Sequence, residues 1–187
     1  MQMAFYFDQT LCTGCYACIV ACKDWHDIPA GPASWRRVEC IEQGKFPDVF
    51  AAYLSTSCYH CINPTCIPAC PVGAISKTET DGLMVVDSEK CLGKDVCGMA
   101  CKLACPYEAP QFGDEDNARM QMCNFCSDRL EENKEPICVA ACPMRALDAG
   151  PLNKLQDKYG NIGKATGFTY DSENKPSIIF KPKEWAC

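Results

Sequence analysis

Sixteen of the eighteen cysteines in this chain fall into four sets of four, and this arrangement constrains the fold more than any other feature. Four sulfurs so close together need a common explanation, and disulfides, zinc and iron–sulfur clusters are the candidates. The sets are Cys12, Cys15, Cys18 and Cys22; Cys58, Cys61, Cys66 and Cys70; Cys91, Cys97, Cys101 and Cys105; and Cys123, Cys126, Cys138 and Cys142. Cys40 and Cys187 stand outside them.

The spacing within the sets separates the three chemistries. Disulfides need Cα atoms about 4.4–6.8 Å apart and gain nothing from a repeated two-residue gap. Zinc ribbons use two separated CxxC pairs around one ion. CTGCYACIVAC, and the Cys-Pro ends of the other three sets, match instead the bacterial ferredoxin run C-x2-C-x2-C-x3-C-P. The spacing therefore predicts iron–sulfur clusters.

The fourth cysteine of such a run explains how two runs combine. Backbone amides in the loop donate hydrogen bonds to the cluster sulfurs, and a helix then carries the chain away. A proline after the fourth cysteine restricts the backbone and turns that cysteine toward a second cluster. Each set must therefore share its clusters with a partner set.

The segment between the second and third sets indicates how they pair. GAISKTETDGLMVVDSEKC has apolar residues at 74–75 and 83–86 around the turn residues Asp81 and Gly82, so we expect a β-hairpin there. Such a hairpin joins the halves of a small ferredoxin, and the first and fourth sets then pair around it. We predict an α+β fold of two interleaved bacterial-ferredoxin-like modules: an outer module (1–50 and 106–150), an inserted module (51–105) and a C-terminal tail (151–187).

This pairing assigns the cysteines to four clusters in a line, which is the arrangement of an electron-transfer wire. The predicted ligand sets are Cys12, Cys15, Cys18 and Cys142 for cluster 1; Cys58, Cys61, Cys66 and Cys105 for cluster 2; Cys70, Cys91, Cys97 and Cys101 for cluster 3; and Cys22, Cys123, Cys126 and Cys138 for cluster 4. The expected cofactors are four 4Fe-4S clusters.

The order of the motifs resembles that of the four-cluster iron–sulfur subunits of dimethyl sulfoxide reductase-type molybdopterin oxidoreductases. The segments that carry the resemblance, within residues 4–155, are CTGCYACIVACKDW, CYHCINPTCIPACPVGAI, ACPYEAPQF, CNFCSDR and CVAACPMRALDAGPL. The resemblance implies a non-catalytic subunit that passes electrons to or from a large molybdopterin or tungstopterin subunit. A membrane anchor or another redox subunit is a second implied partner.

Two other functions compete with this interpretation. A free multi-cluster ferredoxin would carry electrons between enzymes and would be polar nearly all round, whereas a subunit would show an apolar contact area around cluster 1. A purely structural zinc or disulfide protein would contain little iron.

The third set departs from the family pattern. It reads CLGKDVCGMACKLACP, with gaps of five, three and three residues, so Cys97 is displaced from the expected second position. Two alternatives follow for cluster 3: a 4Fe-4S cluster that uses Cys97, or a 3Fe-4S cluster that leaves it unused.

Composition and the remaining motifs exclude several function classes. The net charge of −6 argues against nucleic-acid binding. The sequence has no apolar run of about 18 residues, so we expect no membrane-spanning segment. No nucleotide motif and no catalytic constellation is found. MQMAFYFDQT has neither a basic segment nor an apolar signal core, so we expect a cytoplasmic protein, or alternatively a periplasmic one exported with a signal-bearing partner.

Some residues outside the sets have two interpretations. Cys40 lies in an alternating segment that predicts a strand and a buried, inert thiol, and Cys187 is assigned no role. His60 either tunes cluster 2 or is structural or solvent-facing. Trp25 is expected to pack over a cluster. Arginines near clusters would raise their reduction potentials, and the candidates are Arg36, Arg37, Arg119, Arg129 and Arg145.

The tail has no cluster cysteines and only two apolar spots, Ser177 to Phe180 and Trp185. With so little to bury by itself, it either lies over a partner or is disordered.

Overall fold

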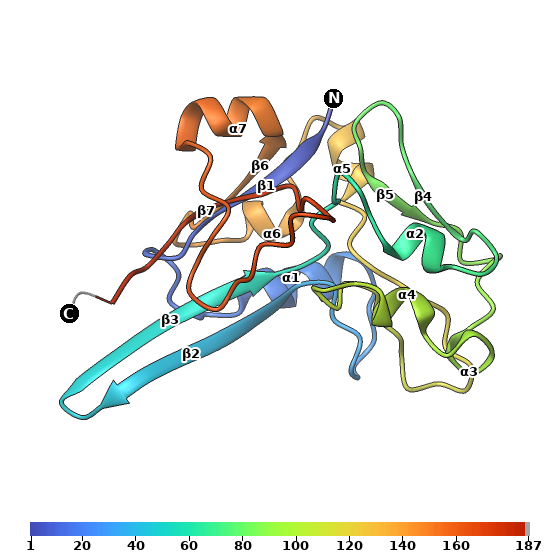
Figure 1. Ribbon diagram of the computed structural model, residues 1–187, viewed down its shortest axis with the longest axis horizontal. Coiled ribbons are helices and arrows are strands. Elements are labelled where there is room, and N and C mark those ends of the chain that lie inside the picture. The colour runs from blue at the N-terminus through green and yellow to red at the C-terminus, as the bar shows by residue number, and fades with distance from the viewer. Residues whose placement is uncertain (186–187) are drawn as a thin grey trace.

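The computed structural model describes residues 1–185, and its central element is one fully buried strand, β1 (Met3–Asp8). β1 pairs antiparallel with β6 (Leu147–Pro151) and parallel with β7 (Ile178–Lys181), in the order β6-β1-β7 (Figure 1). The sheet therefore joins the start of the chain, the segment after the fourth cysteine set and the C-terminal tail.

Both faces of β1 are buried because side chains alternate along a strand. Phe5 and Phe7 face the main core, which contains most of the buried cysteines. Tyr6 faces a second, smaller core with Ile179 of β7 and Leu155 of α7 (Leu152–Tyr159). One sheet thus separates the cysteine-containing part of the molecule from the helix of the tail.

A long hairpin of β2 (Arg37–Lys45) and β3 (Asp48–Thr56) projects from the body of the molecule (Figure 1). Leu54 at its base is buried, whereas Phe46 at its tip is 93 % exposed. The strand expected around Cys40 is present, with Cys40 opposite Tyr53. The expectation of a buried thiol is wrong, because most of β2 faces solvent and Cys40 is exposed.

The hairpin predicted between the second and third cysteine sets is also present, as β4 (Ile75–Lys77) and β5 (Met84–Val86). Asp81 and Gly82 lie in its turn, and Gly82 has a φ of +71°. The Asp81 carbonyl accepts a hydrogen bond from the Met3 amide at 2.8 Å. The turn is therefore attached to the start of β1.

The helices near the cysteines are short, and the residues before several of them are left-handed. α1 (Ala17–Trp25) is nine residues long, and Tyr16 before it has a φ of +59°. Met99 and Cys126 are left-handed in the same way before α4 and α5. The others are α2 (Cys66–Ala69), α3 (Lys94–Cys97), α4 (Ala100–Leu103), α5 (Ser127–Glu131) and α6 (Ile137–Ala140). In residues 1–185 no helix has the length and apolar character needed to cross a membrane.

The C-terminal tail packs into the fold of its own chain. Residues 177–180 are buried, and α7 covers the sheet face opposite the cysteines. The expectation that the tail has little to bury is wrong here, because a short apolar run suffices when it pairs with an existing strand. Cys187 lies outside the described residues, and docking of the tail on a partner stays a prediction.

Candidate functional site

The grouped cysteines come together as free thiols. No cysteine of residues 1–185 forms a disulfide, and of the sixteen grouped cysteines nine are buried and Cys15 alone is exposed. Within the same residues, no three or more His, Cys, Asp or Glu side chains converge closely enough to hold a single metal ion.

The four cysteines predicted for cluster 1 line one cavity. Cys12, Cys15 and Cys18 come from the loop and helix start at residues 12–18, and Cys142 comes from the end of the fourth set. Gly14 in this loop has a φ of +68°, and a Cβ there would lie 2.3 Å from the Tyr53 ring. Glycine is therefore required, because the loop both turns left-handed and presses against the β2–β3 hairpin.

The four cysteines predicted for cluster 3 line a second cavity, to which Phe112 and Met120 also contribute. These cysteines are Cys70, Cys91, Cys97 and Cys101. The long gap in this set is taken up by α3, which ends at Cys97. The Cys97 thiol donates a hydrogen bond to the Gly93 carbonyl at 3.1 Å. The displaced cysteine is therefore brought to the same cavity as its three predicted partners.

The cysteines predicted for cluster 2 lie together in the interior. Cys58, Cys61 and Cys66 are each at most 9 % exposed. Burial, and then the neighbouring sulfurs of Cys105 and Cys66, raise the pKa of the Cys61 thiol to about 12. The four sulfurs are thus close enough to interact electrostatically.

The cysteines predicted for cluster 4 are arranged in the same way. Burial raises the pKa of Cys22 to about 12, with Arg36 opposing the rise and Cys138 and Cys126 adding to it. Burial raises the pKa of Cys123 as well, and Cys138 and Cys22 again contribute. Such buried thiols need a positive partner to become thiolates, and iron supplies one.

The same kind of hydrogen bond occurs in each of the three Cys-Pro turns. In each turn, the amide of the alanine four residues after the cysteine donates to its sulfur. These bonds are Ala74 to Cys70 at 3.3 Å, Ala109 to Cys105 at 3.5 Å and Ala146 to Cys142 at 3.3 Å. The residue before each alanine is left-handed: Gly73 at +61°, Glu108 at +48° and Arg145 at +53°. This repeated geometry directs an amide at each sulfur.

A second repeated contact occurs at two CxxC starts. The amide of His60 donates to Cys58 Sγ at 3.5 Å, and the amide of Phe125 donates to Cys123 Sγ at 3.4 Å. His60 and Phe125 are also left-handed, at +45° and +62°. Amide donors stabilise a thiolate more than a neutral thiol, so this donor set fits iron–sulfur ligation.

Comparison with known proteins agrees with this geometry. Residues 49–152 match the 4Fe-4S dicluster domain. The sequence is 42 % identical to the B subunit of anaerobic dimethyl sulfoxide reductase from Escherichia coli (strain K12), over 97 % of this chain and 89 % of the relative. This protein belongs to that family of iron–sulfur subunits. The resemblance inferred from the five motifs is therefore confirmed.

Other relatives extend the family beyond one substrate. The B subunit of anaerobic dimethyl sulfoxide reductase from Haemophilus influenzae (strain ATCC 51907 / DSM 11121 / KW20 / Rd) is 38 % identical, over 99 % of this chain and 91 % of the relative. The thiosulfate reductase electron transfer subunit PhsB of Salmonella typhi is 37 % identical, over 83 % and 79 %. As a member of this iron–sulfur subunit family, the protein is an electron-transfer subunit and not a catalytic one.

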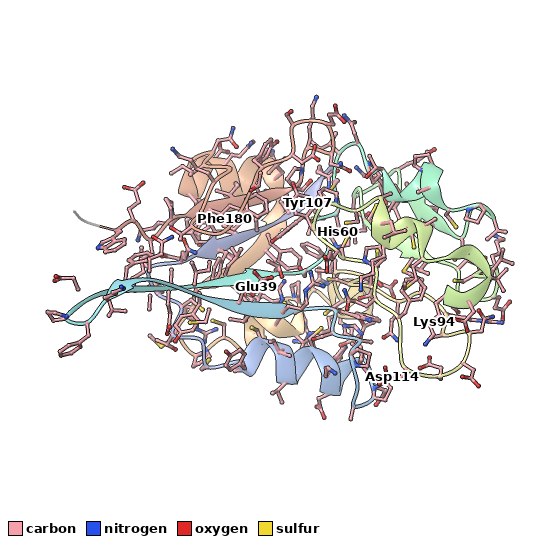
Figure 2. The ribbon with its side chains drawn as sticks, turned by 60° about the horizontal axis from the view of Figure 1, so that its bottom comes forward. Glu39, His60, Lys94, Tyr107, Asp114 and Phe180 are labelled. Carbon is pink, nitrogen blue, oxygen red and sulfur yellow. The ribbon has the colours of Figure 1, made fainter. Side chains whose placement is uncertain are left out.

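In this iron–sulfur subunit, His60 lies in the centre of the molecule (Figure 2) and is 1 % exposed, so the solvent-facing alternative is wrong. Its Nδ1 accepts a hydrogen bond from the Met84 amide at 2.9 Å. Burial, and then the charge of Lys77, lower the pKa of His60 to about 3. His60 is therefore neutral near neutral pH. Its contact with a predicted ligand is made by its backbone amide, which donates to Cys58 Sγ.

Two residues after the first set contact the segment that contains the fourth set. Trp25 Nε1 donates to Asp128 Oδ2 at 2.7 Å, and the guanidinium of Arg129 lies 4.5 Å from the Trp25 ring centre. His26 Nε2 lies 3.3 Å from Cys126 Sγ. No local sequence pattern predicts this last contact, because the two residues are 100 positions apart.

Of the five candidate arginines, Arg36 alone is buried. Arg37 instead donates to the carbonyls of Tyr107 and Glu108, and Arg129 donates to the Glu135 carbonyl. Arg145 is exposed in its Cys-Pro turn. The structure therefore separates one interior cation from four at or near the surface.

Proposed function

We propose that this subunit conducts electrons through four 4Fe-4S clusters held in a line between two redox partners. The proposed ligand sets are those given above for clusters 1 to 4, and the modules are residues 1–50 with 106–150 and the inserted residues 51–105. The observation that carries the proposal is that two of the predicted sets each line one cavity, while the sulfurs within each of the other two sets lie close enough to interact.

Contacts between sets support a particular order. The Cys18 sulfur of cluster 1 interacts with Cys138 of cluster 4. The Cys58 sulfur of cluster 2 interacts with Cys123 of cluster 4, and the Cys66 sulfur interacts with Cys101 of cluster 3. The clusters therefore follow one another in the order 1, 4, 2, 3.

The link between the two modules lies at clusters 4 and 2. There the His60 and Phe125 rings meet edge to face with their centres 5.3 Å apart. His60 lies two residues after Cys58 and Phe125 two residues after Cys123, so these rings join the two cysteine loops. His60 is 1 % exposed and Phe125 is fully buried, so the space between clusters 4 and 2 is part of the low-dielectric interior.

For cluster 3, the placement of Cys97 favours four irons. Cys97 lines the same cavity as Cys70, Cys91 and Cys101, and its sulfur interacts with Cys101. When bound, a 4Fe-4S cluster takes up and returns one electron. The protein's own residues hold it, donate amide hydrogen bonds to its ligands and keep water away.

Exposed apolar side chains at both ends of the line favour a subunit over a free ferredoxin. Near cluster 1, Leu11, Tyr16, Val20 and Met144 are 41–66 % exposed. Near cluster 3, Leu92, Val96 and Leu103 are 40–80 % exposed. We assign the first area to a large molybdopterin or tungstopterin subunit and the second to a membrane anchor or another redox subunit.

The test is the iron and acid-labile sulfide content of the anaerobically purified protein, with electron paramagnetic resonance during a redox titration. About 16 irons per chain and four interacting signals are expected. About 15 irons, with a signal in the oxidised protein, would make cluster 3 a 3Fe-4S cluster. Stoichiometric zinc with little iron would overturn the proposal, and isolation without any large subunit would favour the free ferredoxin.

A further inference from the structure

Arg36 is a buried cation without a carboxylate partner. Its side chain is 3 % exposed, and none of the ion pairs found in residues 1–185 includes it. The guanidinium donates to Ser55 Oγ at 3.0 Å and to Ser57 Oγ at 3.1 Å, and it lies 4.7 Å from the centre of the Phe5 ring. Burying an unpaired charge is costly, so a fold that retains one needs a nearby negative charge.

The groups that could supply this negative charge are cysteine ligands. The sulfurs that interact with the guanidinium, strongest first, are those of Cys138, Cys18, Cys123 and Cys22. Cys18 belongs to proposed cluster 1, and the other three belong to proposed cluster 4. The strongest partners of Arg36 therefore belong to two neighbouring clusters of the outer module.

Ser55 extends the contact with cluster 1. It accepts a hydrogen bond from Arg36 and lines the cavity of cluster 1 together with Cys18. The two serine contacts hold the planar guanidinium in place, and an arginine keeps its charge at any pH that the protein survives. The cation is thus fixed in position as well as permanent.

We propose that Arg36 is the buried counter-cation of clusters 1 and 4 and raises the reduction potentials of both. This inference rests on the proposed function. A cluster with four thiolates is already anionic, and reduction adds one more negative charge. A fixed cation in a low-dielectric interior stabilises the reduced form more than the oxidised form. Arg36 acts through charge and position and does not itself carry electrons.

The test compares Arg36→Gln, Arg36→Lys and Arg37→Gln with the wild type, each purified anaerobically with its partner subunits. The midpoint potentials of all clusters are measured by redox titration with electron paramagnetic resonance. In Arg36→Gln, we expect the one-electron reduction constants of two clusters to fall at least about tenfold, which is 59 mV each. Arg36→Lys, which keeps the charge, should give a smaller fall, and the control Arg37→Gln should change no constant more than about threefold.

Equal shifts in all four clusters, or shifts below about threefold in Arg36→Gln, would overturn the proposal. Equal effects of Lys and Gln would also overturn it, because they would indicate a packing role. If Arg36→Gln fails to fold, Arg36→Lys and Ser55→Ala decide, since Ser55→Ala loosens the guanidinium and should lower the potentials of clusters 1 and 4 while leaving those of clusters 2 and 3 unchanged. Fewer than four clusters in the wild type would instead count against the proposed function, and iron per chain is measured first to separate the two failures.

Discussion

On one face of β1, Met3, Phe5 and Phe7 pack among thiols and short loops, whereas on the other face Ala4 and Tyr6 pack against α7. The cysteines on the first side lie in left-handed turns, in the nine-residue α1 and in helices of only four or five residues. The second face is covered by one regular eight-residue helix. The same strand thus supports two kinds of core.

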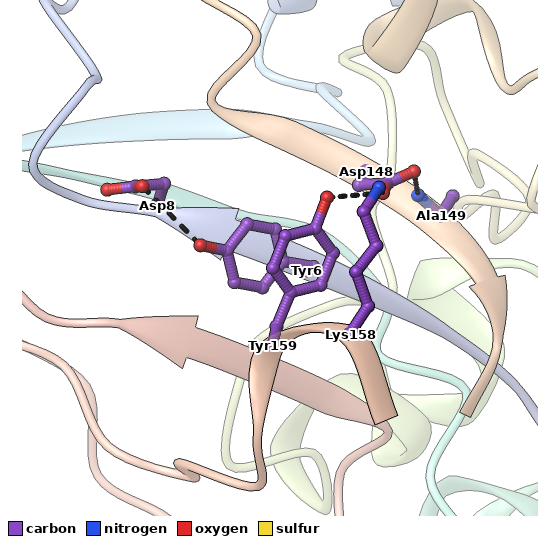
Figure 3. Close-up of polar contacts among 6 residues, drawn as sticks. All are labelled: Tyr6, Asp8, Asp148, Ala149, Lys158 and Tyr159. Carbon is purple, nitrogen blue, oxygen red and sulfur yellow. Dashed lines mark hydrogen bonds and ion pairs between the residues drawn. The ribbon is translucent and has the colours of Figure 1, made fainter. Parts of the chain in front are cut away.

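The α7 face is held by ordinary contacts within the chain. The rings of Tyr6 and Tyr159 stack with their centres 3.6 Å apart. Asp148 on β6 accepts hydrogen bonds from the Tyr159 hydroxyl at 2.7 Å and from Lys158 Nζ at 2.9 Å (Figure 3). The hydrogen bonds and ring packing of these side chains are complete without a cofactor.

The cysteine face is different, because its loops are organised around sulfurs that remain free thiols. Short helices and left-handed residues are unfavourable on their own, since each fixes the backbone for few hydrogen bonds. The comparison indicates that the α7 face folds from its own contacts and that the cysteine face depends on its cofactors.

Removing the iron should produce the largest difference in stability between the two faces. After anaerobic chelation, we expect amides in residues 58–74 and 91–105 to exchange hydrogen at the rate of an unprotected chain. Amides of β6 and α7 should keep much of their protection, because their packing is complete within the chain. Hydrogen-exchange mass spectrometry of the loaded and chelated protein measures both. Uniform loss of protection would show that the two faces do not differ in this way.

Phe5→Ala should be the most damaging single substitution on the cysteine face. Phe5 is 1 % exposed, and its ring centre lies 4.3 Å from that of Phe125. Truncating such a side chain costs about 3–5 kcal/mol. We expect a lower midpoint of urea unfolding together with less iron per chain, measured on the same anaerobic samples.

Leu155→Ala is the matched change on the α7 face. Leu155 is 4 % exposed in the second core, so its truncation should cost about 2–5 kcal/mol. The unfolding midpoint should fall, but iron per chain should stay at the wild-type value. Iron loss as large as that in Phe5→Ala would remove the distinction between the faces.

Local patterns predicted the cysteine face better than the packing around it. The β4–β5 hairpin and the joining of Cys70, Cys91, Cys97 and Cys101 follow from spacing, because cysteine gaps and turn residues act over a few positions. The burial of Arg36 depends on Phe5, Ser55 and Ser57, which no motif connects.

Long-range pairing explains the other misses. β7 joins β1 across most of the chain, and a four-residue apolar run contains no information about that partner. The exposure of Cys40 follows from the β2–β3 hairpin leaving the body, whereas alternation along β2 predicted a covered face. Contacts between distant segments are set by the assembled core and not by local pattern.

Gly73→Ala tests the repeated Cys-Pro turn with a smaller effect. Gly73 has a φ of +61°, and a Cβ there would meet nothing within 4 Å. The cost is therefore the left-handed backbone alone, about 1 kcal/mol, or about 2–4 °C in the melting temperature. Because Glu108 and Arg145 already carry side chains at the equivalent position, we expect full iron content. Loss of cluster 3 in electron paramagnetic resonance would contradict the equivalence of the turns.

The smallest expected effect is a change in pH dependence on the α7 face. Burial, and then the charge of Asp8, raise the pKa of Tyr6 from 10.0 to about 12. Between these values the unfolded chain loses this proton and the folded chain keeps it, so stability is present below about pH 10 and falls as the pH rises. In Tyr6→Phe, thermal unfolding between about pH 9 and 11.5 should show a shallower loss than the wild type.

The slope should be reduced in Tyr6→Phe and not abolished, because burial also raises the pKa values of Tyr59 and Tyr107. Tyr170→Phe is the control, since Tyr170 is 45 % exposed and outside both cores, and it should follow the wild-type slope. Iron content measured at each pH separates this titration from cluster loss. Identical slopes for Tyr6→Phe and the wild type would mean that the Tyr6 hydroxyl is as free to ionise in the folded chain as in the unfolded one, and that the α7 face is more open to water than its packing indicates.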